Sequence, residues 1–164
     1  MNMRLDYSYQ AQLGIPGTLY DISPHAIDSR QNAEERAGAM RFGVGVMRGD
    51  APGTDVRLPR AGDNLAVFEG VSIGSQTTDM DMQGDLKIRH RQTVGVMRWG
   101  RAWVRVAGGL SVRYGDPVFL IRNGADAGLF TNLAAGNLAV NAAFIGGLGT
   151  SDVAPIEIYN QKSE

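Results

Sequence analysis

A run of acidic residues from Asp79 to Asp85 has the composition of a calcium-binding loop. The sequence Asp79-Met80-Asp81-Met82-Gln83-Gly84-Asp85 places carboxylates at the first and third positions and glycine at the sixth, as calcium loops of the EF-hand type do. The twelfth position, counted from Asp79, is His90, where such a loop needs a glutamate that binds through both oxygens. The run is therefore better explained as the acidic outer face of a strand, and we expect no metal site.

The residue types needed for acid–base or nucleophilic catalysis are few in this chain. His25 and His90 are the only imidazoles, and the chain has no G-x-S-x-G sequence that would present a serine nucleophile. No spacing of carboxylates singles out a catalytic pair. The chain has no cysteine for a thiolate nucleophile, a thiolate metal site or a disulfide. We therefore expect a protein that is not an enzyme, with no catalytic residues and no cofactor.

Residues 86–115 combine positive charge with tryptophan and contain no acidic residue. A basic groove with stacking aromatic rings can hold single-stranded nucleic acid, which is one hypothesis for this stretch. The formal net charge of −1 argues against it. A positive face that docks on an acidic protein surface, with Trp and Arg as anchors, fits better. Lys87, Arg89 and Arg91 are also explained as the solvated face of one strand. The lysine, arginine and tryptophan residues of this stretch are Lys87, Arg89, Arg91, Arg98, Trp99, Arg101, Trp103, Arg105 and Arg113.

The elements that would position these residues are strands. Glycine makes up 22 of 164 residues, roughly twice the ordinary usage of about 7%, and is scattered at turn-like spacing. Apolar and polar residues alternate with a period of two in short segments, which is typical of β-strands. Asn123-Gly124 predicts a type I′ hairpin turn. The alternating or short apolar segments are 44–48, 94–98, 103–106, 110–114, 118–121 and 156–159.

The sequence VGVMR occurs twice, at 44–48 and at 94–98. The flanking residues, AMRF and RHRQ, show no further similarity, so a duplicated unit is not indicated. The glycine spacing does not match a phosphate-binding loop. Both copies are therefore predicted as β-strands. Trp103, in a valine-rich alternating segment, is expected in the core or in an oligomer interface.

The first forty residues differ from the rest. Ser23-Pro24 could begin a short helix, but Ile27 is the only large apolar residue between His25 and Gly38, so an extended arm is at least as well supported. Tyr7 and Tyr9 occupy alternate positions, as side chains on one face of a strand do, so the arm could add a strand to the sheet of a neighbouring molecule. We expect an arm over 1–40 and a β-rich domain over 41–164. The fold class is all-β, a compact barrel or sandwich-like domain with few short helices.

Neither a secretory signal nor a membrane-spanning segment is expected, because the longest apolar stretch, residues 138–148, is short and interrupted.

The order and spacing of short segments along the chain resemble the structural cement proteins of tailed bacteriophages, which decorate the outside of capsids. The matching segments cover nearly the whole chain. They are Tyr7-Ser8-Tyr9-Gln10, Arg41-Phe42-Gly43-Val44, Leu58-Pro59, Val67-Phe68-Glu69-Gly70, Met97-Arg98-Trp99-Gly100-Arg101-Ala102-Trp103-Val104, Gly115-Asp116-Pro117-Val118 and Pro155-Ile156-Glu157-Ile158.

This resemblance implies a structural virion protein that is made in the cytoplasm of the host bacterium and located on the outer capsid surface. It would bind the major capsid protein, with an expected HK97-type fold, across subunit boundaries, and would stabilise the shell. It would also bind itself, as a homotrimer or alternatively a dimer, with no membrane partner. We expect contacts to the capsid or within the oligomer from Tyr7, Tyr9, Arg98, Trp99 and Arg101. A nucleic-acid-binding β-barrel that uses residues 86–115 is the alternative.

Overall fold

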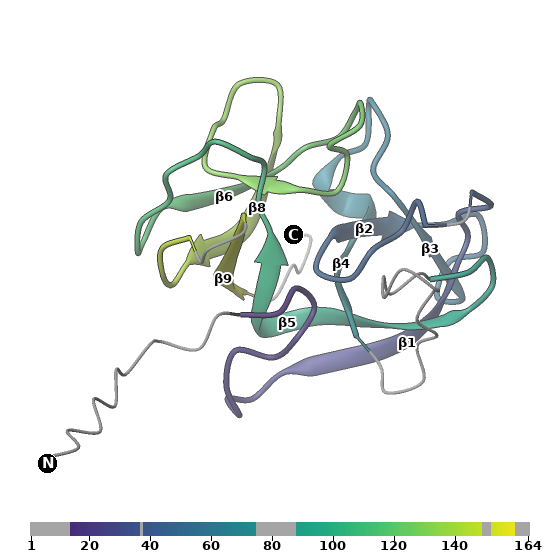
Figure 1. The fold of residues 1–164 in the computed structure, drawn as a ribbon. Helices are drawn as coiled ribbons and strands as arrows, with labels where there is room; N and C mark the ends of the chain where they lie inside the picture. Colours follow the sequence, from purple (N-terminus) through teal and green to yellow (C-terminus); the bar gives the residue numbers. More distant parts are fainter. Residues whose placement is uncertain (1–13, 37, 75–87, 149–151, 160–164) are drawn as a thin grey trace, which may run out of the picture.

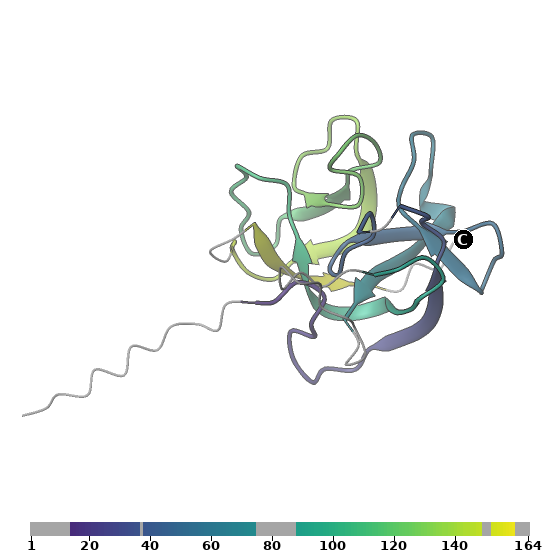
Figure 2. The same ribbon diagram turned by 45° about the vertical axis from the view of Figure 1, so that its right-hand side comes forward.

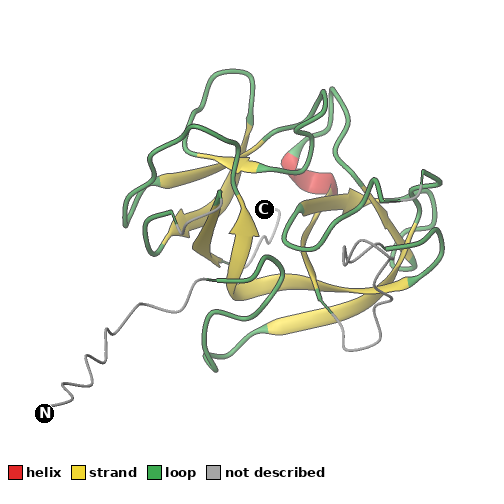
Figure 3. Cartoon of the chain, viewed as in Figure 1, coloured by secondary structure: helices red, strands yellow, loops and turns green. Residues whose placement is uncertain are grey.

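The computed structural model describes residues 14–36, 38–74, 88–148 and 152–159. Strands dominate these ranges, and the only helical element in them is the 3-10 turn η1 (Leu65–Val67), so the predicted all-β class is confirmed (Figure 3). No helix in the described ranges is long and apolar enough to cross a membrane. The strands are β1 (Ala26–Asn32), β2 (Gly45–Arg48), β3 (Asp55–Arg57), β4 (Phe68–Ile73), β5 (Thr93–Arg105), β6 (Pro117–Leu120), β7 (Phe130–Thr131), β8 (Leu138–Phe144) and β9 (Val153–Ile158).

The long strand β5 is shared by two groups of strands that lie side by side (Figures 1 and 2). In the first group the order β1-β3-β2-β4-β5 closes on itself, because β1 also pairs with β5, and this makes a small barrel. In the second group the order is β5-β9-β8-β6-β7. A bridge between Val106, just after β5, and Phe130 of β7 brings the end of that sheet back towards β5. The predicted barrel-like architecture is therefore present in two joined units.

β5 can serve both units because it turns a corner near its middle (Figure 1). Residues before the corner pair with β1 and β4, and residues from Gly100 onward pair with β9. Gly100 has a φ of 131°, and a Cβ atom added to it would lie 2.6 Å from Cβ of His25. Only glycine combines that backbone angle with so close a neighbour. Gly100 therefore defines the corner.

The two VGVMR copies lie on either side of β4, which confirms that both are strands, but their registers against β4 differ by two residues. Val71 of β4 lies opposite Gly45 of the first copy and opposite Met97 of the second. In both copies the two valines lie in the core of the first barrel, while Met47 and Met97 lie in the core of the second unit. Because these strands are buried on both faces, the same combination of glycine, valine and methionine suits both of them.

Two local predictions are wrong. The alternating residues Leu110, Val112 and Tyr114 do not form a strand; Val112 is buried, but the Tyr114 side chain is 80% exposed. The turn at Asn123-Gly124 is not of type I′, which needs positive φ at both central residues, because only Gly124 has a positive φ. β6 and β7 do form a hairpin, but a longer loop joins them, closed by hydrogen bonds between Ile121 and Leu129 and between Gly128 and Ile121.

The first forty residues contribute a strand in the described part. The helix considered at Ser23-Pro24 is absent there, and β1 is extended and pairs antiparallel with β5 along its length. Buried Asn32, at the end of β1, donates from Nδ2 to the carbonyl oxygens of Ile88 and Arg89, at 3.3 and 3.1 Å. The division of the chain at residue 40 stays a prediction, which hydrogen exchange can test.

Candidate interaction surface

The segment before β1 continues along the same strand, β5, with one interruption. Leu19 is bridged to Ala102, and the backbone N–H groups of Gly17 and Tyr20 donate to the carbonyl oxygens of Trp103 and Arg101. Further along, Ala26 of β1 lies opposite Trp99. On β5 a single residue, Gly100, separates Arg101, which bonds to Tyr20, from Trp99, which lies opposite Ala26. In the N-terminal segment the five residues 21–25 span the same distance, so they loop outward at the corner of β5. We call these residues the corner loop.

The corner loop is braced by hydrogen bonds at its base. The Asp21 carboxylate accepts from the backbone N–H of Ser23 at 2.9 Å and from Nη1 of Arg101 at 3.0 Å. Nδ1 of His25 lies 2.9 Å from the carbonyl oxygen of Ser23. The hydrogen bonds from the side chain and backbone of Ser23, followed by those from Arg101, lower the pKa of Asp21 below its usual value. Asp21 therefore remains an anion at neutral pH and ties the loop to β5.

Beside the corner loop the surface is hollowed into a pocket of about 400 Å³. The pocket is bounded by the loop, by the corner of β5 and by the end of β9. We call it the Trp99 pocket. Its lining includes Ser23, Pro24, Trp99, Arg101, Ile158 and Tyr159.

Large apolar side chains are exposed around this pocket. Ile22, in the corner loop, is 100% exposed, and Trp99 and Tyr159 are 36% and 45% exposed. Exposed apolar groups that gather at one place on a surface are typical of a contact with another protein. We call the corner loop together with the Trp99 pocket the Trp99 face.

The charges on the Trp99 face are paired within the chain. Arg101 lies opposite Glu157 across the β5–β9 pair, with Nε and Oε1 3.6 Å apart, in addition to its bond to Asp21. The hydrogen bond to Asp21, and after it the charge of Glu157, raise the pKa of the Arg101 guanidinium above its usual value. The face is thus apolar at its centre, and the charged side chains at its edge, Asp21, Arg101 and Glu157, are paired with one another.

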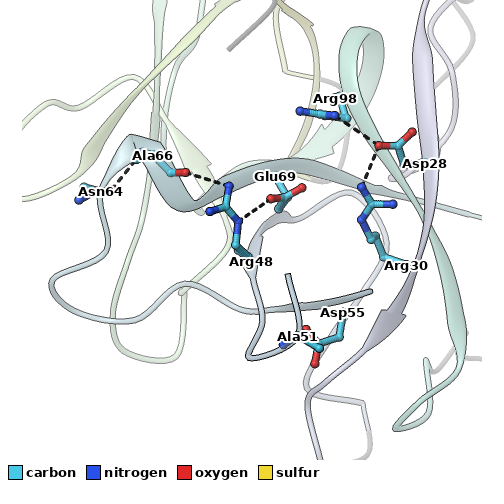
Figure 4. Close-up of polar contacts among 9 residues, drawn as sticks. All are labelled: Asp28, Arg30, Arg48, Ala51, Asp55, Asn64, Ala66, Glu69 and Arg98. Carbon is cyan, nitrogen blue, oxygen red and sulfur yellow. Dashed lines mark hydrogen bonds and ion pairs between the residues drawn. The ribbon is translucent and has the colours of Figure 1, made fainter. Parts of the chain in front are cut away.

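Arg98 points to a different set of partners. Asp28 of β1 lies between it and Arg30, with Nη1 of Arg98 at 3.6 Å and Nη2 of Arg30 at 3.0 Å from the same carboxylate oxygen (Figure 4). The Arg98 side chain remains 56% exposed. The structure therefore brings Trp99 and Arg101 together in one pocket and directs Arg98 towards β1.

The other residues of the basic stretch do not form one basic strand face. His90 and Arg91 lie in a turn before β5, and Arg89 directly precedes it. Nε of Arg105 donates to the carbonyl oxygen of Phe42 at 2.9 Å. Residues 86–115 contain no acidic residue, but folding places the carboxylates of Asp21, Asp28 and Glu157 beside two of their arginines, Arg98 and Arg101. Nothing in this arrangement favours the nucleic-acid-binding alternative.

Trp103 lies half-buried on β5, outside both core clusters, and the chain's own N-terminal segment covers it. Its indole ring packs against Tyr20, and a Cβ atom on Gly14 would lie 1.8 Å from the indole ring. The side chain is thus a packing residue between β5 and residues 14–20.

Several sequence-based hypotheses lie outside the described residues. These are the contacts expected from Tyr7 and Tyr9, the acidic run 79–85 and Lys87. Among the residues that are described, there is no group of three His, Asp or Glu side chains placed to hold a metal ion.

Sequence reasoning missed Ile22, Pro24 and Tyr159 as parts of a surface. Ser23-Pro24 was a usable signal, because a turn directly after an isolated isoleucine can present that side chain to solvent. Tyr159 carried no such signal, since its position beside Trp99 depends on the pairing of β9 with β5.

Comparison with known proteins identifies the family to which the chain belongs. No curated protein matches the sequence. A chain in the solved structure entitled "The capsid of Myoviridae Phage XM1" is similar in fold, with a TM-score of 0.66 and 22% sequence identity over 95% of this chain and 97% of that one. The family model described as "Structural cement protein (E217 gp24/Pam3 gp6)" matches residues 3–159, which is nearly the whole sequence. The chain therefore belongs to the family of phage structural cement proteins.

Proposed function

We propose that this chain binds the outer surface of the assembled phage capsid, across neighbouring copies of the major capsid protein, and thereby stabilises the shell. Family membership makes it a structural, capsid-stabilising protein of the virion. The outer surface, an HK97-type partner and a homotrimeric state are the finer parts of the proposal. The match to the family over residues 3–159 is the observation that carries it.

The physical basis is selective binding to one state of the shell. A protein that binds the closed shell and not its separated subunits lowers the free energy of the closed shell by mass action. A site shared between neighbouring subunits exists in full only in the assembled lattice. A homotrimer would make several such contacts at once, and the high effective concentration within the trimer would strengthen the sum.

The contacts would come from exposed side chains. We propose Arg98, Trp99 and Arg101, together with Tyr7 and Tyr9 of the N-terminal segment, as contacts with the capsid or with other copies of the chain. Specific protein interfaces commonly bury about 1,600 Å² in total. An exposed tryptophan and arginines have the side-chain types that dominate the binding energy in such interfaces. The protein would then act through its surface, without catalysis.

The test is reconstitution with purified protein and undecorated, expanded capsids. We expect saturable occupancy of expanded shells, weak binding to the isolated capsid subunit, and a higher melting temperature of the decorated shell. Electron microscopy would place the bound protein on the outer surface. Saturating occupancy without any gain in shell stability would overturn the stabilising role, and no occupancy would overturn the proposal as a whole.

A further inference from the structure

We propose that the Trp99 face is the contact between copies of this chain, with Ile22 of one copy seated in the Trp99 pocket of the next. This inference rests on the proposed function in one respect, namely that the protein works as a homo-oligomer. It assigns the self-contact to named residues and leaves other surfaces for the shell.

Ile22 has the properties of an inserted side chain. It lies in the corner loop and is 100% exposed, so folding of the single chain does not bury it. The loop beneath it is held by Asp21 through hydrogen bonds from Ser23 and Arg101, and by the His25–Ser23 contact. Because the loop is already braced, seating Ile22 in a partner costs little additional ordering.

The Trp99 pocket has the properties of a receiving site. It has about 400 Å³ of space, and Pro24, Trp99, Ile158 and Tyr159 supply apolar walls. The chain's own Ile22 does not fill it, since that side chain is fully exposed. An apolar pocket lined by aromatic rings is the usual receptor for an aliphatic anchor at an interface.

The charge pattern favours a second copy over an acidic partner. Docking on an acidic surface would use unpaired cations, but Arg101 is already bonded to Asp21 at 3.0 Å and lies 3.6 Å from Glu157. A face that meets another copy of itself must avoid a large net charge, because the two copies carry the same sign. Asp21, Glu157 and Arg101 together leave one negative charge, which repels an acidic partner and is small for a contact between copies.

The location of the two parts also suits a closed assembly. Ile22 adjoins Ser23 and Pro24, which line the pocket, so the protruding and the receiving parts share one face. When the same contact repeats around a symmetry axis, each copy gives one Ile22 and receives one, and the assembly closes without an unused site.

Sedimentation of three proteins tests the inference: the unmodified chain, Ile22→Asp and the matched control Leu133→Asp. Leu133 is 55% exposed and lies in the loop between β7 and β8, outside the pocket, so its substitution adds the same charge elsewhere. We expect a dimer or trimer for the unmodified chain and for Leu133→Asp, and at least a tenfold weaker self-association for Ile22→Asp. A monomeric unmodified chain, or an oligomer that Ile22→Asp leaves intact, would overturn the inference.

A disulfide trap gives a second readout that does not depend on a destabilising charge. The natural chain has no cysteine, so a chain carrying Ile22→Cys alone can form a bond with a Tyr159→Cys chain only between molecules. We expect a mixture of these two chains to cross-link under mild oxidation. Leu133→Cys replaces Ile22→Cys as the control and should not cross-link to Tyr159→Cys. Equal cross-linking in both mixtures would contradict the assignment.

Binding to capsids separates this inference from the proposed function. If Ile22→Asp remains an oligomer but loses its binding to expanded shells, the Trp99 face contacts the shell, and the self-contact is overturned while the function stands. If no form of the chain binds shells but Ile22 still controls self-association, the function is overturned and the self-contact stands.

Discussion

The phenol ring of Tyr20 packs against the indole ring of Trp103, with the ring centroids 5.5 Å apart and the ring planes inclined at 52°. The contact joins the segment before β1 to the second half of β5. It acts together with the backbone hydrogen bond from Tyr20 N–H to the Arg101 carbonyl oxygen and with the hydrogen bond that Nη1 of Arg101 donates to the Asp21 carboxylate. The N-terminal segment therefore covers Trp103.

Trp103→Ala should lower the free energy of unfolding by about 2–3 kcal/mol. A fully buried tryptophan would cost about 3–5 kcal/mol on truncation, and Trp103 is only half-buried. Urea denaturation provides the measurement, with Tyr114→Ala as the control at an aromatic side chain that is 80% exposed and outside the Trp99 pocket. An unchanged midpoint for Trp103→Ala would show that the N-terminal segment does not hold the indole ring in solution.

Gly100→Ala should destabilise the protein more than Gly109→Ala. Both glycines have a positive φ, 131° and 76°, but only the Cβ atom at Gly100 would meet a neighbour, His25, at 2.6 Å. At Gly109 nothing lies within 4 Å, so the cost there is the left-handed backbone alone, about 1–2 kcal/mol. Thermal melting of both variants gives the comparison. Equal losses would mean that the corner of β5 relaxes and imposes no steric demand.

Stability should fall at acid pH through Asp63. Arg57 donates to both carboxylate oxygens of Asp63, at 2.7 and 2.9 Å, and chiefly this hydrogen bonding holds the pKa of Asp63 below its usual 3.8. Because the folded-state pKa is depressed, the contribution is complete above the usual pKa and is lost as the pH falls through the lower folded-state value.

Asp63→Asn should therefore cost about 1–3 kcal/mol at neutral pH, and its deficit should shrink below about pH 4. Denaturation midpoints of the variant and the natural chain across this pH range provide the measurement. Asp152→Asn is the control at an exposed position. A deficit that stays constant with pH would show that Asp63 contributes through its shape and not through its charge.

Hydrogen exchange tests the predicted arm over residues 1–40. In the structure, β1 pairs with β5 over residues 26–31, and the N–H groups of Gly17 and Tyr20 donate to β5. We expect the amides of residues 26–31 to exchange as slowly as those of residues 93–99 in the free protein. Rapid exchange throughout 14–36 would instead support a separate arm that is ordered only by a partner.

The sequence alone determined the chain's all-β class and several of its strands. Strand formation at the two VGVMR copies follows from alternation and β-branched residues, and these are local properties. The glycine at position 100 was visible as well, but its role was not, because a corner in β5 depends on which strands pair with each half. The resemblance to cement proteins could likewise be recognised from the sequence, since it rests on the order and spacing of short segments.

Local patterns failed where a backbone partner was needed. Residues 110–114 alternate as a strand would, and Val112 is buried, but an alternating segment becomes a strand only if another strand is adjacent to it. Asn123-Gly124 has the residues of a tight hairpin turn, yet the hydrogen bonds of Ile121 with Leu129 and Gly128 set a longer loop. Tertiary pairing overrode turn propensity in that case.

The tertiary structure alone decided the character of the proposed site. Residues 86–115 have no acidic member, so the linear sequence indicated a positive face. Folding brings Asp21 and Glu157 to Arg101 from the two ends of the chain, and brings Asp28 to Arg98. Electrostatic interaction depends on distance in space and not on separation along the chain, so only the paired strands could show that the surface around Trp99 is apolar and that its charges are paired within the chain.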